Sequence, residues 1–212
     1  MNKERTYQKE RKEVARFMRR LYNHGLTTTS GGNISLRISD EIILITPSAT
    51  DKGRMRWKEV GIMTIHGENL TPDLKLSIEY EMHLSIYNKT KDVSAIVHAH
   101  PLFASAFTAM KLKINTNLTA EARAICSDPL FVPYALMGTK KLASLAAGSI
   151  MKSDILLLEN HGILTCGSSL LQAFDKLEVL ENAARMTMIV EMTGKKKPLS
   201  KKRISELEKL FR

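Results

Sequence analysis

Residues 95–101 read AIVHAHP, an apolar run that ends with two histidines, His98 and His100. An extended chain projects alternate side chains to one face, so both imidazoles would lie on the same side of a strand. Such a pair suits a metal ion, but the pattern also fits two polar residues on the solvated face of a half-buried strand. A catalytic zinc site has three protein ligands and one open position, so a third ligand is needed at the end of another strand.

The stretch DILLLENHGIL, residues 154–164, offers a candidate for that third ligand. Its apolar run predicts a buried strand that ends near His161, and Gly162 allows the backbone to turn away at once. As a single histidine beside asparagine and glycine, His161 fits a turn residue equally well, and both interpretations stay open here. Three neutral imidazoles suit Zn²⁺, and Co²⁺ or Mn²⁺ could occupy the same site.

The segment SIEYEMHLSIY, residues 77–87, predicts a helix that Ser77 can cap. Glu79 and His83 lie four residues apart, which places them on one face of this helix. Spacing alone favours a solvated first-turn carboxylate that complements the helix dipole as the role of Glu79. We expect His83 to be an orienting or core histidine rather than a ligand.

Small polar residues gather at SGGN, residues 30–33, and again around Ser48 in ITPSAT and at Ser77. Glycines expose backbone N–H groups, and serine and asparagine side chains add donors, which is what binding a phosphate without a Walker motif requires. An ordinary turn between a helix and a strand is the alternative interpretation.

The composition favours one domain with a sizeable core, since 43% of the 212 residues are hydrophobic. No segment approaches the run of about 20 apolar residues that spans a bilayer. The first residues are charged where a signal peptide needs an apolar stretch, so we expect a cytoplasmic protein. Cys126 and Cys166 are isolated, which predicts reduced structural thiols.

The net charge of +10 does not by itself indicate nucleic acid, because the excess is diffuse and only 6% of the residues are aromatic. A positive field attracts small anionic substrates such as phosphate esters equally well. The basic residues are denser in the first twenty positions and in GKKKPLSKKR, residues 194–203, which we interpret as an exposed tail or short linker.

Helical and strand patterns alternate along the chain without internal repeats, which predicts an α/β or α+β layered sandwich. Periodicity leaves the order of the strands in the sheet open. The expected helices span residues 5–24, 77–88, 101–110, 139–151 and 169–193, and the expected strands lie within residues 27–38, 40–48, 93–100, 131–135 and 154–160.

Together these segments resemble the class II aldolase family, the metal-dependent group with L-fuculose-phosphate aldolase and L-ribulose-5-phosphate 4-epimerase. The resemblance extends from about residue 11 to residue 194, in the order SGGNIS, ITPSAT, SIEYEMHL, IVHAHP, VPYALMGT and LLLENHGIL. It implies that His98, His100 and His161 bind zinc. It also implies one αβα sandwich over residues 1–212, with a mainly antiparallel central sheet and a basic tail from about residue 195, assembled as a homotetramer with active sites between subunits.

Position 79 separates the chemistries of this family. Its aldolases carry glutamate there and its epimerases aspartate, so Glu79 implies an aldolase in which this carboxylate moves a proton at the reacting carbon, beside a metal-stabilised enediolate. The chain departs from the family where Ile78 replaces a second serine and Ala49 replaces a glycine. It also has no tyrosine after Tyr134, whereas the bacterial fuculose-phosphate enzyme uses one near its C-terminus.

Glu121 lies roughly where the dehydratase branch of the family places a catalytic glutamate. We interpret it as a candidate second acid-base residue, and a purely structural role is the alternative.

The sequence and the resemblance therefore predict a zinc-dependent aldolase that cleaves a ketose 1-phosphate into dihydroxyacetone phosphate and an aldehyde. A dehydratase, decarboxylase or epimerase on the same scaffold is the nearest alternative. A basic zinc-containing protein that binds nucleic acid is a distant one, because structural zinc sites are closed by four ligands. We expect a sugar phosphate as the substrate, with neither nucleic acid nor membrane as a partner. The predicted phosphate-binding residues are Ser30, Gly32, Asn33, Ser48 and Ser77.

Overall fold

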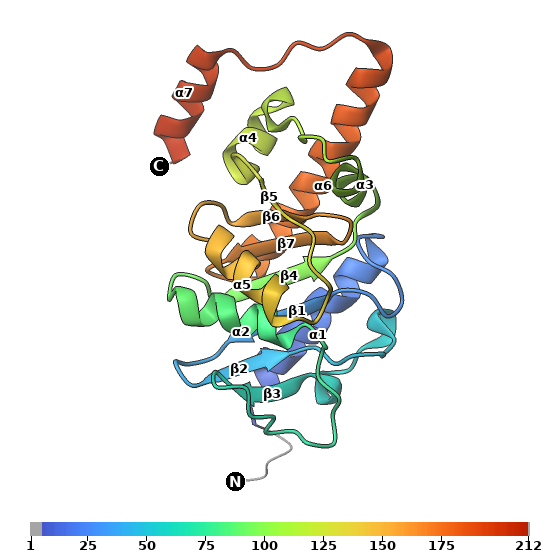
Figure 1. Cartoon of the computed structure of the whole chain (residues 1–212), viewed down its shortest axis with the longest axis vertical. Coiled ribbons are helices and arrows are strands. Elements are labelled where there is room, and N and C mark those ends of the chain that lie inside the picture. Colours follow the sequence, from blue (N-terminus) through green and yellow to red (C-terminus); the bar gives the residue numbers. More distant parts are fainter. Residues whose placement is uncertain (1–5, 212) are drawn as a thin grey trace.

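The computed structural model describes residues 6–211, within which seven strands form one sheet in the order β3-β2-β1-β4-β7-β6-β5 (Figure 1). Only β5 and β6 pair in parallel in this sheet, and the other neighbours are antiparallel. The predicted mainly antiparallel sheet is therefore confirmed. The strands are β1 (Asn33–Arg37), β2 (Ile42–Ile45), β3 (Gly61–Thr64), β4 (Ala95–Ala99), β5 (Leu130–Val132), β6 (Ile155–Leu158) and β7 (Gly162–Gly167).

Helices cover both faces of the sheet, which confirms the three-layer αβα sandwich. In Figure 1, α2 and α5 lie in front of the sheet, and α1 and α6 lie behind it. The two layers correspond to two separate hydrophobic clusters, one on each face. The helices are α1 (Gln8–Asn23), α2 (Tyr80–Lys89), α3 (Leu102–Met110), α4 (Ala120–Cys126), α5 (Lys140–Ser149), α6 (Leu170–Thr193) and α7 (Lys201–Phe211).

The alternation of side chains along β4 explains how the histidines reach their layer. Ala95, Val97 and Ala99 belong to the cluster on the α1 and α6 side, whereas Ile96 belongs to the cluster on the α2 and α5 side. Because side chains alternate with a period of two, His98 points to the same side as Ile96, toward α2. The strand therefore places His98 beside the helix that carries Glu79.

Each of the five predicted helices corresponds to an observed helix, with end shifts of up to three residues. Arg5, the expected start of the first helix, lies outside the described residues. The predicted Ser77 cap is wrong: α2 begins at Tyr80, its N-cap is Glu79, and the Ser77 hydroxyl instead accepts a 3.3 Å hydrogen bond from the Glu79 N–H. We did not predict β3, β7 or α4.

The lysine-rich end of the chain is more ordered than the expected tail or linker. After α6 the chain is extended through Ser200 and then forms α7, which lies beside α4 (Figure 1). The guanidinium of Arg123 on α4 contacts the Glu208 carboxylate on α7 at 2.5 Å, so an ion pair joins the two helices. No helix within residues 6–211 has the length and apolar character that a bilayer crossing requires.

Candidate active site

Three histidines meet at the C-terminal end of β4, in the middle of the sheet. His98 lies on β4, His100 follows the end of that strand, and His161 lies in the turn between β6 and β7. One ring nitrogen from each lies within 4.8 Å of the other two. The centroids of the His98 ring and of each of the other two rings are 4.8 Å apart. The structure therefore brings the three predicted ligands together.

A short hairpin places His161. The loop between β6 and β7 has three residues, and Asn160 adopts a left-handed conformation with φ of 53°, which asparagine tolerates better than most residues. The His161 N–H donates to the Leu158 carbonyl at 3.1 Å. The Glu159 carboxylate also accepts hydrogen bonds from the Tyr134 N–H at 3.1 Å and the Lys111 ammonium at 3.3 Å, which tethers the hairpin tip.

A hydrogen bond fixes which nitrogen of His98 can bind a metal. Its Nδ1–H donates to the Ile163 carbonyl on β7 at 2.9 Å, so Nε2 is the nitrogen that carries the free lone pair in a neutral ring. Nε2 is buried, and no N–H or O–H group of the described residues donates to it. An imidazole held this way is oriented for a cation on its Nε2 side.

Glu79 faces two of the three histidines. Its carboxylate oxygens lie 3.2 Å from His98 Nε2 and 3.3 Å from His161 Nε2. Only 6% of Glu79 is exposed, so the alternative of a solvated first-turn carboxylate is wrong. Burial alone would raise the pKa of Glu79, but the neighbouring His98, His161 and Asn33 hold it well below its usual range.

The electrostatics of the histidines fit a metal site. Burial, together with the nearby His98, lowers the pKa of His100 to about 3 and that of His161 to about 4, so both are neutral ligands at pH 7. At His98, burial lowers the pKa, but the Glu79 carboxylate outweighs it and raises the pKa. The Glu79 carboxylate therefore favours positive charge in the space between itself and the histidines. A divalent cation bound there would supply that charge. The donor set fits such an ion, because the buried His98 Nε2 receives no hydrogen bond and faces the Glu79 carboxylate.

The predicted phosphate donors line one cavity of about 220 Å³ together with Glu79, His100 and His161. Gly32 has φ of 67°, and an added Cβ would lie 2.7 Å from the His98 carbonyl oxygen, so only glycine fits where β1 begins beside β4. The cavity is lined by Ser30, Gly31, Gly32, Asn33, Pro47, Ser48, Lys52, Ser77, Ile78, Glu79, His100, Met137 and His161.

Lys52 is a cavity residue that we did not predict. It is 1% exposed, and its ammonium donates to the Pro47 carbonyl and, at 3.5 Å, to the Thr50 hydroxyl. Burial lowers its pKa to about 8, so it is mostly protonated at pH 7. Within residues 6–211 no carboxylate lies within 4.0 Å of it. The only signal in the sequence is a lysine inside the small polar stretch that follows Ser48.

Glu121 lies away from this cavity in the described part of a single chain. It is exposed in the first turn of α4, and it does not line the space beside the histidines. Its proposed role as a second acid-base residue stays a prediction.

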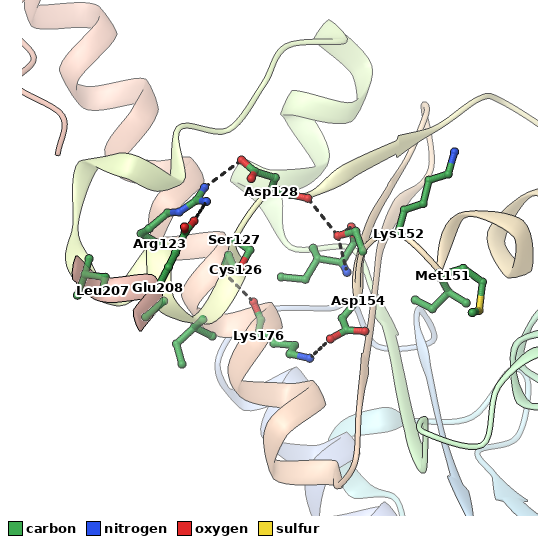
Figure 2. Close-up of a pocket in the computed structure, with 15 residues that line it drawn as sticks. Arg123, Cys126, Ser127, Asp128, Met151, Lys152, Asp154, Lys176, Leu207 and Glu208 are labelled. Carbon is green, nitrogen blue, oxygen red and sulfur yellow. Dashed lines mark hydrogen bonds and ion pairs between the residues drawn. The ribbon is translucent and has the colours of Figure 1, made fainter. Parts of the chain in front are cut away.

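A larger cavity of about 500 Å³ lies where α4 and α7 meet the edge of the sheet (Figure 2). Its charged groups largely neutralise one another: Arg123 pairs with Asp128 and Glu208, and Lys176 pairs with Asp154 at 2.7 Å. No histidine lines it in the described structure. This cavity is larger than the one beside the histidines, but the candidate catalytic groups lie in the smaller one.

Comparison with known proteins agrees with this geometry. A family model described as "Class II Aldolase and Adducin N-terminal domain" matches residues 12–188. An L-fuculose phosphate aldolase of Methanococcus vannielii is 34% identical over 84% of this chain and 96% of its own length. A 5-deoxy-D-ribulose 1-phosphate aldolase of Bacillus thuringiensis is 30% identical over 96% of each chain.

One further relative is named as a decarboxylase, and a solved aldolase structure shares the fold. A 3-oxo-tetronate 4-phosphate decarboxylase of Haemophilus influenzae is 30% identical over 79% of this chain and 81% of its own length. A solved L-fuculose 1-phosphate aldolase superposes with a TM-score of 0.87 at 28% identity, covering 95% of each chain. With three histidines and a buried glutamate at the predicted positions, the chain belongs to the class II aldolase family.

Proposed function

We propose that this protein is a zinc-dependent aldolase that cleaves a ketose 1-phosphate into dihydroxyacetone phosphate and an aldehyde. The observation that carries the proposal is the position of Glu79, 3.2 Å and 3.3 Å from two of three clustered histidines, in a cavity lined by phosphate donors. A metal site and a buried carboxylate that face the same small space are what proton transfer next to a carbonyl requires.

His98, His100 and His161 would hold the ion. A divalent cation there would act as a Lewis acid on the carbonyl and neighbouring hydroxyl oxygens of the substrate. Zn²⁺ fits three neutral imidazoles best, and Co²⁺ or Mn²⁺ would fit the same donors.

Glu79 would carry the proton at carbon. In the cleavage direction Glu79 would first take up a proton from solvent and then deliver it to the carbon that loses the aldehyde, and in the reverse direction the ionised carboxylate would remove a proton from bound dihydroxyacetone phosphate. Because the pKa of Glu79 lies well below its usual range, the carboxylate is ionised and can act as a base in the condensation direction. Glu121 remains our candidate for the second proton transfer, at the hydroxyl of the aldehyde half.

The phosphate would lie at the glycine and serine end of the cavity. Lys52 supports this assignment because a buried ammonium without a described carboxylate partner is a favourable neighbour for a phosphate dianion. The other predicted phosphate-binding residues are Ser30, Gly32, Asn33, Ser48 and Ser77, and all five line the same cavity.

A homotetramer with sites between subunits is the assembly that we propose. Ile78 and Met137 line the cavity and are 51% and 52% exposed, and Tyr134 and Leu136 nearby are 57% and 63% exposed. Large apolar side chains gathered beside a polar site are typical of a surface that a partner covers. One domain over residues 1–212, a cytoplasmic location and the absence of nucleic-acid or membrane partners stay predictions.

Decarboxylation of a phosphorylated sugar acid is the second candidate, because a relative with that name is 30% identical. The same metal and phosphate groups would serve it, since loss of carbon dioxide also leaves negative charge beside a carbonyl. A dehydratase would instead depend on Glu121.

The test is a comparison of substrates with zinc-loaded protein. L-fuculose 1-phosphate and 5-deoxy-D-ribulose 1-phosphate are assayed for release of dihydroxyacetone phosphate, and 3-oxo-tetronate 4-phosphate for release of carbon dioxide. Cleavage of a ketose 1-phosphate that a chelator abolishes would support the proposal. Carbon dioxide release with no cleavage of either ketose would replace it with the decarboxylase.

A further inference from the structure

A buried chain of hydrogen bonds runs from Glu79 into the core between α2 and the sheet. Asn33 Nδ2 lies 2.9 Å from a Glu79 oxygen, and Asn33 Oδ1 lies 2.5 Å from His83 Nε2. His83 Nδ1 lies 2.6 Å from the Ser35 hydroxyl, which lies 2.8 Å from the Tyr87 hydroxyl. Asn33, Ser35, His83 and Tyr87 are at most 3% exposed, so water does not compete for these contacts.

The spacing of the residues along α2 and β1 explains how this chain of hydrogen bonds forms. Glu79, His83 and Tyr87 are spaced four residues apart, so they follow one face along α2 from its N-cap. Asn33 and Ser35 are two residues apart on β1, so they share the face of the strand that looks toward α2. The helix and the strand therefore interleave their polar side chains as glutamate, asparagine, histidine, serine and tyrosine.

The chemistry of the groups fixes the direction of every bond. An ionised carboxylate only accepts, so the amide nitrogen of Asn33 donates to Glu79 and its carbonyl oxygen faces His83. His83 must then donate from Nε2, which leaves Nδ1 to accept from the Ser35 hydroxyl. Burial lowers the pKa of His83 to about 3, so the ring is neutral and holds one tautomer. Because the Ser35 proton is used for His83, Ser35 accepts from the Tyr87 hydroxyl, which also lies 3.4 Å from the Ser94 carbonyl, and the donors of the chain point toward Glu79.

We propose that His83 is a positioning residue for catalysis, which locks the Asn33 amide so that its N–H, and not its oxygen, faces the Glu79 carboxylate. This inference rests on the proposed function. Either end of an amide can face a neighbour, and only the N–H end stabilises an ionised carboxylate. The Glu79 carboxylate already favours this orientation, and His83 reinforces it, because the opposite orientation would place the His83 N–H against the amide NH₂ group.

For the reaction, the consequence of these hydrogen bonds is a fixed orientation of the Glu79 carboxylate. One Glu79 oxygen is held by Asn33, and the other, 3.3 Å from His161 Nε2, has no hydrogen-bond partner in the described structure and would be the one to exchange a proton with the substrate. Loss of the Asn33 donor would let the carboxylate rotate, and proton transfer depends steeply on this geometry. Asn33 would therefore orient Glu79 in addition to making the predicted contact with phosphate.

The experiment measures deuterium incorporation into dihydroxyacetone phosphate by zinc-loaded His83→Gln, His83→Leu and Tyr87→Phe variants, with kcat, KM and zinc content for each. The glutamine amide of H83Q can still donate to Asn33 Oδ1, whereas the leucine of H83L leaves that oxygen unsatisfied. We expect H83L to lose about 10- to 100-fold in kcat with KM and zinc content near those of the wild type, as outer-shell losses do. H83Q should recover most of that loss, and Y87F should lose only about two- to threefold because Ser35 still donates to His83.

The outcomes separate this inference from the proposed function. If the wild-type protein exchanges no deuterium, the proposed function fails and takes the positioning role with it. If the wild type exchanges and a folded H83L matches its kcat, or H83Q loses as much as H83L, the positioning role alone is overturned. If H83L does not fold, Ser35→Ala provides the same test. It removes the hydroxyl that donates to His83 Nδ1 and supports the Nε2–H tautomer, so a wild-type kcat in that variant would also overturn the inference.

Discussion

Replacing Gly162 with alanine tests whether the hairpin between β6 and β7 holds His100 in place. Gly162 begins β7, and an added Cβ would lie 2.5 Å from His100 Cδ2 and 2.7 Å from the Ala99 carbonyl oxygen. Side chains do not approach other atoms this closely, so a neighbour must move. Because β4 is paired on both sides, by β1 and β7, the His100 ring is the neighbour that yields more easily.

The size of the displacement follows from the contact distances. Ordinary van der Waals contact begins at 3.4 Å, so the 2.5 Å approach forces the imidazole edge to retreat by about 0.9 Å. A misplacement of about 1 Å costs on the order of 10²-fold in rate, and disturbed support of a metal ligand costs about 10- to 100-fold in metal affinity. We therefore expect zinc to bind about 1.4 to 2.7 kcal/mol more weakly.

Competition with a chromogenic chelator measures the zinc Kd of the variant, and urea unfolding measures its stability. Gly148→Ala is the matched control, because a Cβ at this position in α5 meets nothing within 4 Å. Alanine there should leave the zinc Kd unchanged and stabilise the helix by up to about 1 kcal/mol. A folded G162A that binds zinc with wild-type affinity would refute the steric account of the His100 position.

Three further predictions concern the same site. Glu79→Gln should retain zinc but lower the rate of proton exchange in dihydroxyacetone phosphate by about 10² to 10⁴, and a variant with full exchange would remove Glu79 from the mechanism. The KM for a phosphorylated substrate should rise as the pH increases through about 8, because Lys52 loses its charge there, and Lys52→Met should abolish this pH dependence. An unchanged profile in K52M would contradict a contact between Lys52 and phosphate. Zinc at 100 times its Kd should stabilise the fold by about 2.7 kcal/mol and raise Tm by roughly 5–11 °C. The same Tm in chelator and in zinc would show that the folded protein has no preference for the ion.

The histidine cluster could be predicted because local geometry decides most of it. Period-two alternation places His98 and His100 on one face of a strand, and this does not depend on which strands lie beside it. The strand that follows His161 was harder to predict, since β7 is buried along its whole length, has a glycine at each end and shows little alternation. The resemblance to the family indicated that His161 joins His98 and His100, which periodicity alone did not.

Other features depend on tertiary contacts that no local pattern encodes. Lys52 is 1% exposed, held by hydrogen bonds from its N–H to the Thr29 carbonyl and from its ammonium to the Pro47 carbonyl, whereas the average lysine is exposed. The pairing of Asn33 with His83 joins residues 50 positions apart, so strand register and helix placement had to be known first. At the C-terminal end, the run of lysines predicted an exposed tail, so the helical pattern that follows it, in α7, was missed.

The most direct test of the central claim is deuterium exchange into dihydroxyacetone phosphate, followed by proton NMR with zinc-loaded and chelated protein. This measurement requires no knowledge of the aldehyde. We predict loss of the signal from one hydroxymethyl hydrogen with zinc and no loss after chelation. A protein that holds one zinc ion per chain and exchanges no deuterium would contradict the aldolase chemistry that we assign to Glu79 and the three histidines.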